Sequence, residues 1–234
     1  METKITKSVA NYSDFEDIRP YHQSEFAEAW KRITTEPTFF AALKYLFPEE
    51  ENKKIVAELN QINSTKEFQL RVMHHAIRNI IKQSSVGLTC SGFENIDAQK
   101  SYLYISNHRD IFLDSGILQI LLVEHEHDTT EITFGSNLMI NQFITDVGKA
   151  NKMFTVYRGG TRRELYENSL RLSNYIRHTI TEKKQSAWIA QRNGRTKNGA
   201  DETQVGLLKM LASSGTTNFE NTFRELNYFR KLFR

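Results

Sequence analysis

The sequence predicts an α/β fold in which a layered mixed sheet is flanked by helices and preceded by an N-terminal helical cap. Two observations support this prediction: apolar side chains recur at helical spacing up to about residue 83, and short β-rich segments alternate with helical ones after it. The chain of 234 residues is 39% apolar and 25% charged, which suits one globular domain with a helical appendage. We therefore divide it into an N-terminal helical region (1–83) and an α/β domain (84–234).

Start signals divide the N-terminal region into four helices. The first covers residues 21–33, whose apolar side chains fall on one helical face. Pro37 opens a second helix, and Pro48 with the three glutamates after it opens a third. Ser64 and Glu67 have the spacing of a capping box, which predicts a long amphipathic helix from there through residue 80.

Strand and helix signals alternate through the rest of the chain. Predicted strands cover residues 86–90, 102–106, 132–134, 153–156 and 186–190. Predicted helices cover about 112–124, 139–148, 161–181 and 203–212. The tail over residues 223–234 mixes Phe and Leu with Arg and Lys, as interfacial helices do, and a frayed terminus is the alternative.

Several protein classes are excluded by composition. The longest apolar run, residues 116–123, is interrupted by Gln119 and falls short of the roughly 20 residues that a membrane span requires. The N-terminal lysines are followed by no apolar segment, so we expect no secretory signal. A single cysteine, Cys90, allows no internal disulfide. These features predict a cytoplasmic protein in a reducing setting.

Positive charge is concentrated in one part of the chain. The net charge is +3 overall, but residues 152–199 contain eleven cations and three anions, a local excess of +8. Such a segment suits phosphate groups or an anionic surface. A solvated helix face is the alternative explanation.

A candidate general base follows the predicted strand at 102–106. His108 lies just past the strand end, and Asp110 and Asp114 stand near the start of the next helix, where a carboxylate can fix the imidazole tautomer and stabilise its charged form. Ligand sites of open α/β sheets cluster at such strand ends. A structural turn is the alternative for this segment.

Two further strand ends carry arginine beside glycine. Arg158 ends one strand and is followed by two glycines and a helix, so its guanidinium and the helix N–H groups could hold a phosphate together. After the strand at 186–190, Gly194 is surrounded by three cations in sequence: Arg192, Arg195 and Lys197. The pattern indicates an enzyme that acts on a hydroxyl near a phosphate.

The order of these segments resembles the glycerolipid acyltransferase family, which acylates glycerol-3-phosphate or its 1-acyl derivative. The likeness covers roughly residues 86–212. The family's first block, Asn-His followed by Asp, resembles Asn107 and His108 here; the second resembles 154–158; the third resembles 193–196. The segment 136–138 after Gly135 is similar to the one that leads into the family's second block.

The resemblance implies that His108 deprotonates the acceptor hydroxyl, which attacks the thioester of acyl-CoA or acyl-carrier protein without any further cofactor or metal. Leu113 stands where the family has Asp, so we expect Asp114, one residue later, to pair with His108, with Asp110 as the alternative. Arg158 and Arg195 would hold the acceptor phosphate. Arg192, Lys197 and Gly194 are assigned to the same role.

The implied partners are the acyl donor, a glycerol-phosphate or lysophospholipid acceptor and the inner face of a membrane, with no nucleic acid. Two departures accompany the resemblance: Asn193 replaces the family's Glu, and no proline follows Pro48, although the family's fourth block is a late strand with proline. We therefore expect an acyltransferase-like domain truncated at its C-terminus.

Two other functions are also compatible with the sequence. The first is a non-catalytic module that binds anions or phospholipids through the Arg-rich segment 152–199. The second is a metal-dependent hydrolase that uses His108, Asp110 and the 125–128 cluster, which is part of the segment 124–128. For that segment we predict an exposed polar turn, because its two histidines lack a second pair of ligands at metal-site spacing.

Overall fold

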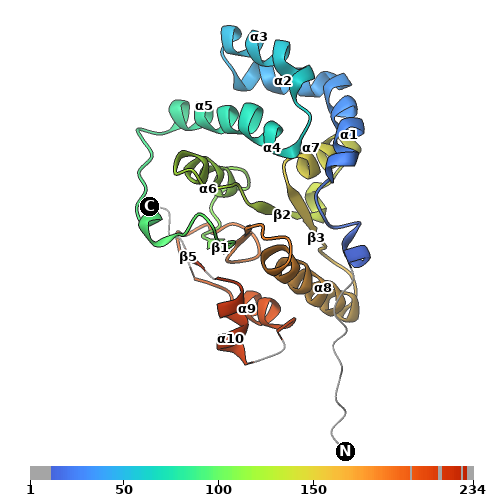
Figure 1. Ribbon diagram of the computed structural model, residues 1–234, viewed down its shortest axis with the longest axis vertical. Coiled ribbons are helices and arrows are strands. Elements are labelled where there is room, and N and C mark those ends of the chain that lie inside the picture. Colours follow the sequence, from blue (N-terminus) through green and yellow to red (C-terminus); the bar gives the residue numbers. More distant parts are fainter. Residues whose placement is uncertain (1–11, 201, 216–217, 228, 231–234) are drawn as a thin grey trace, which may run out of the picture.

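The computed structural model describes residues 12–200, 202–215, 218–227 and 229–230. The predicted α/β class is confirmed: a parallel sheet is flanked by helices and joined to an N-terminal helical region. Figure 1 shows the N-terminal helices at one end of the molecule, the last two helices at the other, and the sheet between them. Among the described residues, no helix combines the length and the apolar character needed to cross a bilayer.

The N-terminal region is helical, as predicted. Its α-helices are α1 (Gln23–Thr35), α2 (Pro37–Leu46), α3 (Glu49–Glu58), α4 (Thr65–Phe68) and α5 (His74–Ser84), and a π-helical turn (Gln69–Met73) joins the last two. Pro37 occupies the first position of α2, where its missing N–H costs nothing. Ser64 caps α4 by accepting the N–H of Glu67 at 3.1 Å. The capping signals therefore identify the helix starts correctly.

The sheet has the strand order β3-β2-β4-β1-β5. Its strands are β1 (Leu103–Ser106), β2 (Glu131–Gly135), β3 (Met153–Val156), β4 (Ala187–Ala190) and β5 (Phe229–Arg230). All four pairings between the described strands are parallel, so the predicted mixed sheet is corrected to a parallel one. The reason is that helices connect β1 to β2, β2 to β3 and β3 to β4, and such crossovers return the chain in the same direction.

The remaining helices follow the predicted alternation. They are α6 (Leu113–Glu124), α7 (Gln142–Ala150), α8 (Arg162–Thr181), α9 (Val205–Ala212) and α10 (Phe219–Glu225), with 3₁₀ turns at Tyr12–Phe15, Leu59–Gln61, Phe93–Asn95 and Ser136–Leu138. Of the two alternatives for the tail over 223–234, the described residues do not form an interfacial helix, because α10 ends at Glu225 and residues 229–230 pair with β1. Residues 228 and 231–234 lie outside the described part of the chain.

The strand predicted at 86–90 is also wrong. This segment forms no ladder in the structure, and the Val86 side chain is fully exposed. Leu88 and Cys90 instead pack at the edge of an apolar cluster that contains Tyr104 and Trp188. The apolar side chains of this segment are used in packing. Its backbone pairs with no other strand among the described residues.

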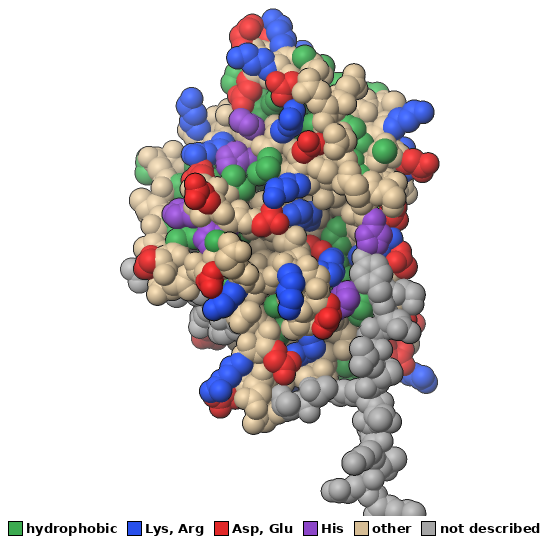
Figure 2. Space-filling view, viewed as in Figure 1, with side chains coloured by type: hydrophobic (Ala, Val, Ile, Leu, Met, Phe, Trp, Pro, Cys, Tyr) green, Lys and Arg blue, Asp and Glu red, His purple; other side chains and the backbone are tan. Residues whose placement is uncertain are grey.

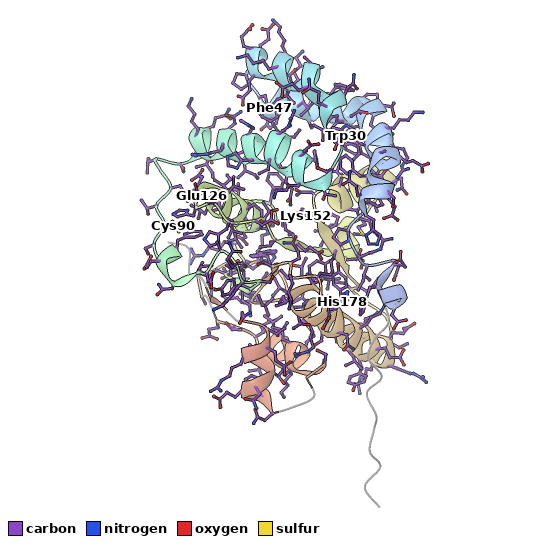
Figure 3. The ribbon with its side chains drawn as sticks, viewed as in Figure 1. Trp30, Phe47, Cys90, Glu126, Lys152 and His178 are labelled. Carbon is purple, nitrogen blue, oxygen red and sulfur yellow. The ribbon has the colours of Figure 1, made fainter. Side chains whose placement is uncertain are left out.

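The two faces of β1 contribute to different apolar clusters. Leu103 and Ile105 face one that is shared with α8 and α9, whereas Tyr104 faces a cluster shared with α6. This division follows from the two-residue period of a strand. A third cluster lies under the N-terminal helices and includes Ala150 of α7, so the helical region shares a core with the α/β part. Figure 3 places Trp30 and Phe47 of this third cluster among the cap helices.

Two ion pairs near the N-terminus predict a loss of stability in acid. A hydrogen bond from the Arg171 guanidinium lowers the pKa of the Asp17 carboxyl to about 2, and one from Arg19 lowers that of Glu25 to about 2. In the unfolded chain these carboxyls titrate near 4. Their contribution is therefore complete above about pH 5 and is lost as the pH falls through about 2.

We expect the free energy of unfolding, measured in urea between pH 6 and pH 2.5, to fall less steeply with acid for the Asp17→Asn/Glu25→Gln variant than for the wild type. Glu28→Gln is the matched control, because Glu28 is an exposed carboxyl on α1, three residues after Glu25, and its side chain forms no ion pair within the described residues. Equal slopes for the double variant and the wild type would show that these pairs do not govern the acid response.

Candidate active site

His108 and Asp114 form a hydrogen-bonded pair at the carboxyl end of β1. The Nδ1 atom of His108 lies 2.9 Å from Oδ2 of Asp114, which stands in the first turn of α6. Asp114 also accepts the backbone N–H groups of Arg109 at 2.8 Å and Asp110 at 3.1 Å, which fix the carboxylate. A carboxylate at Nδ1 requires the proton there, so a neutral His108 presents Nε2 as an acceptor. This arrangement is suited to a general base.

Asp110 has a different position. Its Oδ1 atom accepts the N–H groups of Phe112 at 2.8 Å and Leu113 at 2.7 Å, so it caps the start of α6. Of the two carboxylates predicted as partners of His108, the structure therefore brings Asp114 to the imidazole and assigns Asp110 to the helix. A turn at residues 111–112 separates Asp110 from the start of α6.

The loop after β4 is attached directly to the His108 loop. The N–H of Thr196 donates to the carbonyl oxygen of His108 at 2.8 Å. The buried amide of Gln191 donates through Nε2 to Oδ1 of Asn107 at 2.9 Å, and its Oε1 accepts the Thr203 hydroxyl at 3.0 Å. Gln191 thus joins three segments at the site. Gln191 is not among the predicted site residues, although a polar side chain directly after a buried strand is a recognisable signal.

His108 opens onto a cavity of about 320 Å³ that Arg158, Gly194 and Arg195 also line. The rest of its wall is largely apolar and includes Phe112, Phe134, Val156 and Trp188. The ends of β1, β2, β3 and β4 all contribute to it, as expected when parallel strands end at one edge of a sheet. The base and the two arginines that the sequence placed at separate strand ends are therefore brought together.

The Arg158 side chain packs closely against the backbone at the end of β2. A Cβ atom added to Gly135 would lie 3.0 Å from Nε of Arg158 and 2.7 Å from Oδ1 of Asn137, so the glycine leaves room for the guanidinium. The backbone N–H of Arg158 donates to the hydroxyl of Ser136 at 3.0 Å. Within the described residues neither Arg158 nor Arg195 has an ion-pair partner, so both guanidinium groups are available to an anion.

Arg192 and Lys197 are not in the cavity with His108. They line a second, open hollow of about 550 Å³, which shares Arg195 with the first. The predicted phosphate site groups Arg192 and Lys197 with Arg158 and Arg195. The structure corrects the grouping to two adjacent hollows, because the loop after β4 turns at Gly194, whose φ of 80° suits glycine.

A small apolar hollow adjoins the His108 cavity on the side of the helical cap. Its volume is about 30 Å³, and it shares Phe112, Ser115, Ile132 and Met153 with the cavity. Met73 and Ile77 of the cap form its opposite wall. The α5 and α6 helices approach closely here, since a Cβ on Gly116 would lie 2.7 Å from Cδ1 of Ile77.

The histidines of the segment 124–128 are held by local contacts. The ring of His125 stacks on Phe93 with centroids 3.8 Å apart, and its Nδ1 lies 2.8 Å from the Leu121 carbonyl oxygen. Asp128 pairs with Lys66 at 3.3 Å. Over the described residues, no group of three or more His, Cys, Asp and Glu is placed to hold a metal ion.

The cationic segment 152–199 does not form one continuous patch. Five of its eleven cations lie beside carboxylates: Arg163, Arg171, Arg177, Lys183 and Lys152. On the face seen in Figure 2, Lys and Arg are interspersed with Asp and Glu. Five others follow the strand ends: Arg158, Arg162, Arg192, Arg195 and Lys197. The positive charge available to a ligand is therefore concentrated at the carboxyl edge of the sheet.

Lys152, the first cation of that segment, is engaged in hydrogen bonds inside the protein. It lies between the cap and the sheet (Figure 3), where its Nζ donates to the Thr129 hydroxyl at 2.8 Å, and that hydroxyl donates to Oε1 of Gln69 at 2.6 Å. Burial lowers the pKa of the Lys152 ammonium. This chain of hydrogen bonds ties the π-helical turn of the cap to the start of β3.

No protein-family model matches the chain, and no curated protein matches it.

Proposed function

We propose that the protein transfers a fatty acyl group from acyl-CoA or acyl-carrier protein to the hydroxyl of glycerol-3-phosphate or of its 1-acyl derivative. The observation that carries the proposal is the shared cavity: His108, oriented by Asp114, lines the same hollow as Arg158 and Arg195. A base for a hydroxyl and two cations for a phosphate are thus combined at one strand edge.

In the proposed reaction, Nε2 of His108 takes the proton of the acceptor hydroxyl as its oxygen attacks the thioester carbonyl carbon. The new C–O bond forms, the C–S bond breaks, and the leaving thiolate takes the proton from the imidazolium. An O-acyl ester and a free thiol are the products. Asp114 stabilises the imidazolium while it exists, since its carboxylate lies at hydrogen-bond distance from Nδ1.

The surroundings of His108 suit the two substrates. Arg158 and Arg195 approach from two different strands, and paired guanidinium groups bind a phosphate more specifically than one does. The apolar hollow beneath the cap offers the acyl chain an extension of the cavity. A chain longer than a few carbons requires the cap and α6 to move apart, because the space there is only about 30 Å³.

Exposed apolar side chains surround the same edge and favour a peripheral position on the inner face of a membrane. Seven of the twelve large apolar side chains that are exposed in the described structure follow the carboxyl ends of the strands: Ile111, Phe112, Ile140, Tyr157, Leu165, Tyr166 and Val205. With the cations beside them, they have the composition of a surface that contacts anionic lipid. A lysophospholipid acceptor could reach His108 from there.

The test is acceptor-dependent release of thiol. The purified chain is incubated with acyl-CoA of several chain lengths, or with acyl-carrier protein, in the presence and absence of glycerol-3-phosphate or its 1-acyl derivative. We expect one thiol released for each ester formed, the ester being identified by mass spectrometry. If no donor releases thiol with either acceptor, the acyltransferase is rejected. Binding of glycerol-3-phosphate without turnover would then indicate an anion-binding module.

A further inference from the structure

The second hollow, beside the proposed active site, carries three cations that the reaction at His108 does not all require. Arg192, Arg195 and Lys197 line it, together with Glu202 and Gln204. Only Arg195 also lines the cavity that contains His108. The two hollows are therefore adjacent and share one guanidinium, so a molecule in the second can extend toward the first.

The walls of this hollow are held in place by hydrogen bonds. Gln204 accepts the N–H of Asn193 through Oε1 at 3.0 Å, and its own N–H donates to the Gln191 carbonyl at 3.0 Å. Oδ1 of Asn198 accepts from the Thr196 hydroxyl at 3.1 Å and from the Ala200 N–H at 3.2 Å. The loop between β4 and α9 is thus tied both to itself and to the start of the helix.

Donor groups in this hollow lack acceptors. Nε of Arg192 is buried and has no hydrogen-bond partner in the described structure. Within the described residues no carboxylate pairs with Arg192, Arg195 or Lys197. An anionic ligand with several oxygens would supply acceptors for those donor groups of the three side chains that face the hollow.

We propose that this hollow binds the phosphate esters of the acyl donor's phosphopantetheine arm. The inference rests on the proposed function, which assigns Arg158 and Arg195 to the acceptor phosphate and leaves Arg192 and Lys197 without a role. The donor's reacting carbonyl must lie at His108 while its phosphates lie at the far end of a long arm, outside the reaction cavity. Three cations match the several phosphate charges of coenzyme A better than the single phosphodiester of a carrier protein.

Calorimetric titration of the full chain with coenzyme A tests the site without any turnover. We expect Arg192→Gln/Lys197→Gln to weaken coenzyme A binding at least tenfold, and Arg158→Gln to leave it within about twofold. For glycerol-3-phosphate we expect the reverse: Arg158→Gln should weaken its binding at least tenfold, and Arg192→Gln/Lys197→Gln should leave it within about twofold. Lys184→Gln is the control for general electrostatics, because it removes one positive charge just before the amino end of β4, at the opposite edge of the sheet. Circular dichroism of each variant checks the fold.

The choice of probe separates the two donors. If 3′-dephospho-coenzyme A binds more weakly than coenzyme A, the site recognises the nucleotide part and the acyl donor is acyl-CoA. If 4′-phosphopantetheine binds as tightly as coenzyme A, the site recognises the arm alone and the donor is acyl-carrier protein. Unchanged coenzyme A affinity in Arg192→Gln/Lys197→Gln overturns the inference, as does a loss of glycerol-3-phosphate affinity alone. Coenzyme A binding that depends on these cations in a protein without acyl transfer would uphold the hollow and reject the proposed function.

Discussion

Substitution of His108 by alanine is expected to lower kcat for acyl transfer by about 10²- to 10⁴-fold, the range that a positioned general base contributes. The KM for glycerol-3-phosphate should change little, because the acceptor phosphate is assigned to Arg158 and Arg195. The fold should be retained, since the His108 side chain lines a cavity and is not part of the apolar core. Steady-state thiol release and thermal unfolding of the same preparation measure the two effects.

Asp114→Asn should reduce kcat by a similar factor, because an amide at Nδ1 can favour the wrong tautomer and cannot stabilise the imidazolium. Asp110→Asn is the matched control: the same change four residues earlier on the same loop, at a carboxylate that caps α6. Asn is as good a cap as Asp, so kcat should stay within a few-fold of wild type. An equal loss in both variants, or full activity without His108, would refute the assigned base.

Local sequence signals were sufficient for most of the fold and for the His108 pair. Helix starts at Pro37 and Ser64 depend on neighbouring residues only, and so does the alternation that predicted β1 to β4. His108 and Asp114 are six residues apart, on the loop after β1 and in the first turn of α6, so their proximity needed no knowledge of distant contacts. The strand expected at 86–90 failed because a β-rich composition does not reveal whether a partner strand exists.

The other features depend on contacts between distant residues. β5 has two residues and exists only because β1 lies beside it, so no periodic pattern could indicate it. Arg192 and Lys197 line a different hollow from Arg158 because the loop after β4 turns at Gly194. Gln191 acts through Asn107, which lies 84 residues earlier in the chain. Such pairings are set by the strand order, which local spacing does not encode.

Asp146→Asn is expected to destabilise the protein by about 2–3 kcal/mol, because this carboxylate fastens the helical cap to α7. Asp146 is only 1% exposed and accepts the Tyr21 hydroxyl at 2.5 Å, Arg32 Nε at 2.7 Å and Gln142 Nε2 at 2.7 Å. Burial raises the pKa of this carboxyl, but the bonds from Arg32 and Tyr21 more than offset it, so the pKa lies below its ordinary value. The carboxylate is therefore charged at neutral pH.

The expected cost is below the 3–5 kcal/mol that breaking a fully buried pair can reach, since the Arg32 side chain is 46% exposed and can return to water. Lys66→Gln is the control, because it removes the ion pair to Asp128 at the same junction from a side chain that is 60% exposed and leaves Asp128 beside Lys152. That change should cost less than about 1 kcal/mol. Urea unfolding gives both values, and hydrogen exchange should show faster opening of α1 in Asp146→Asn. If the two variants are equally stable, the cap is held by its apolar contacts with Phe143, Val147 and Ala150 and not by this network.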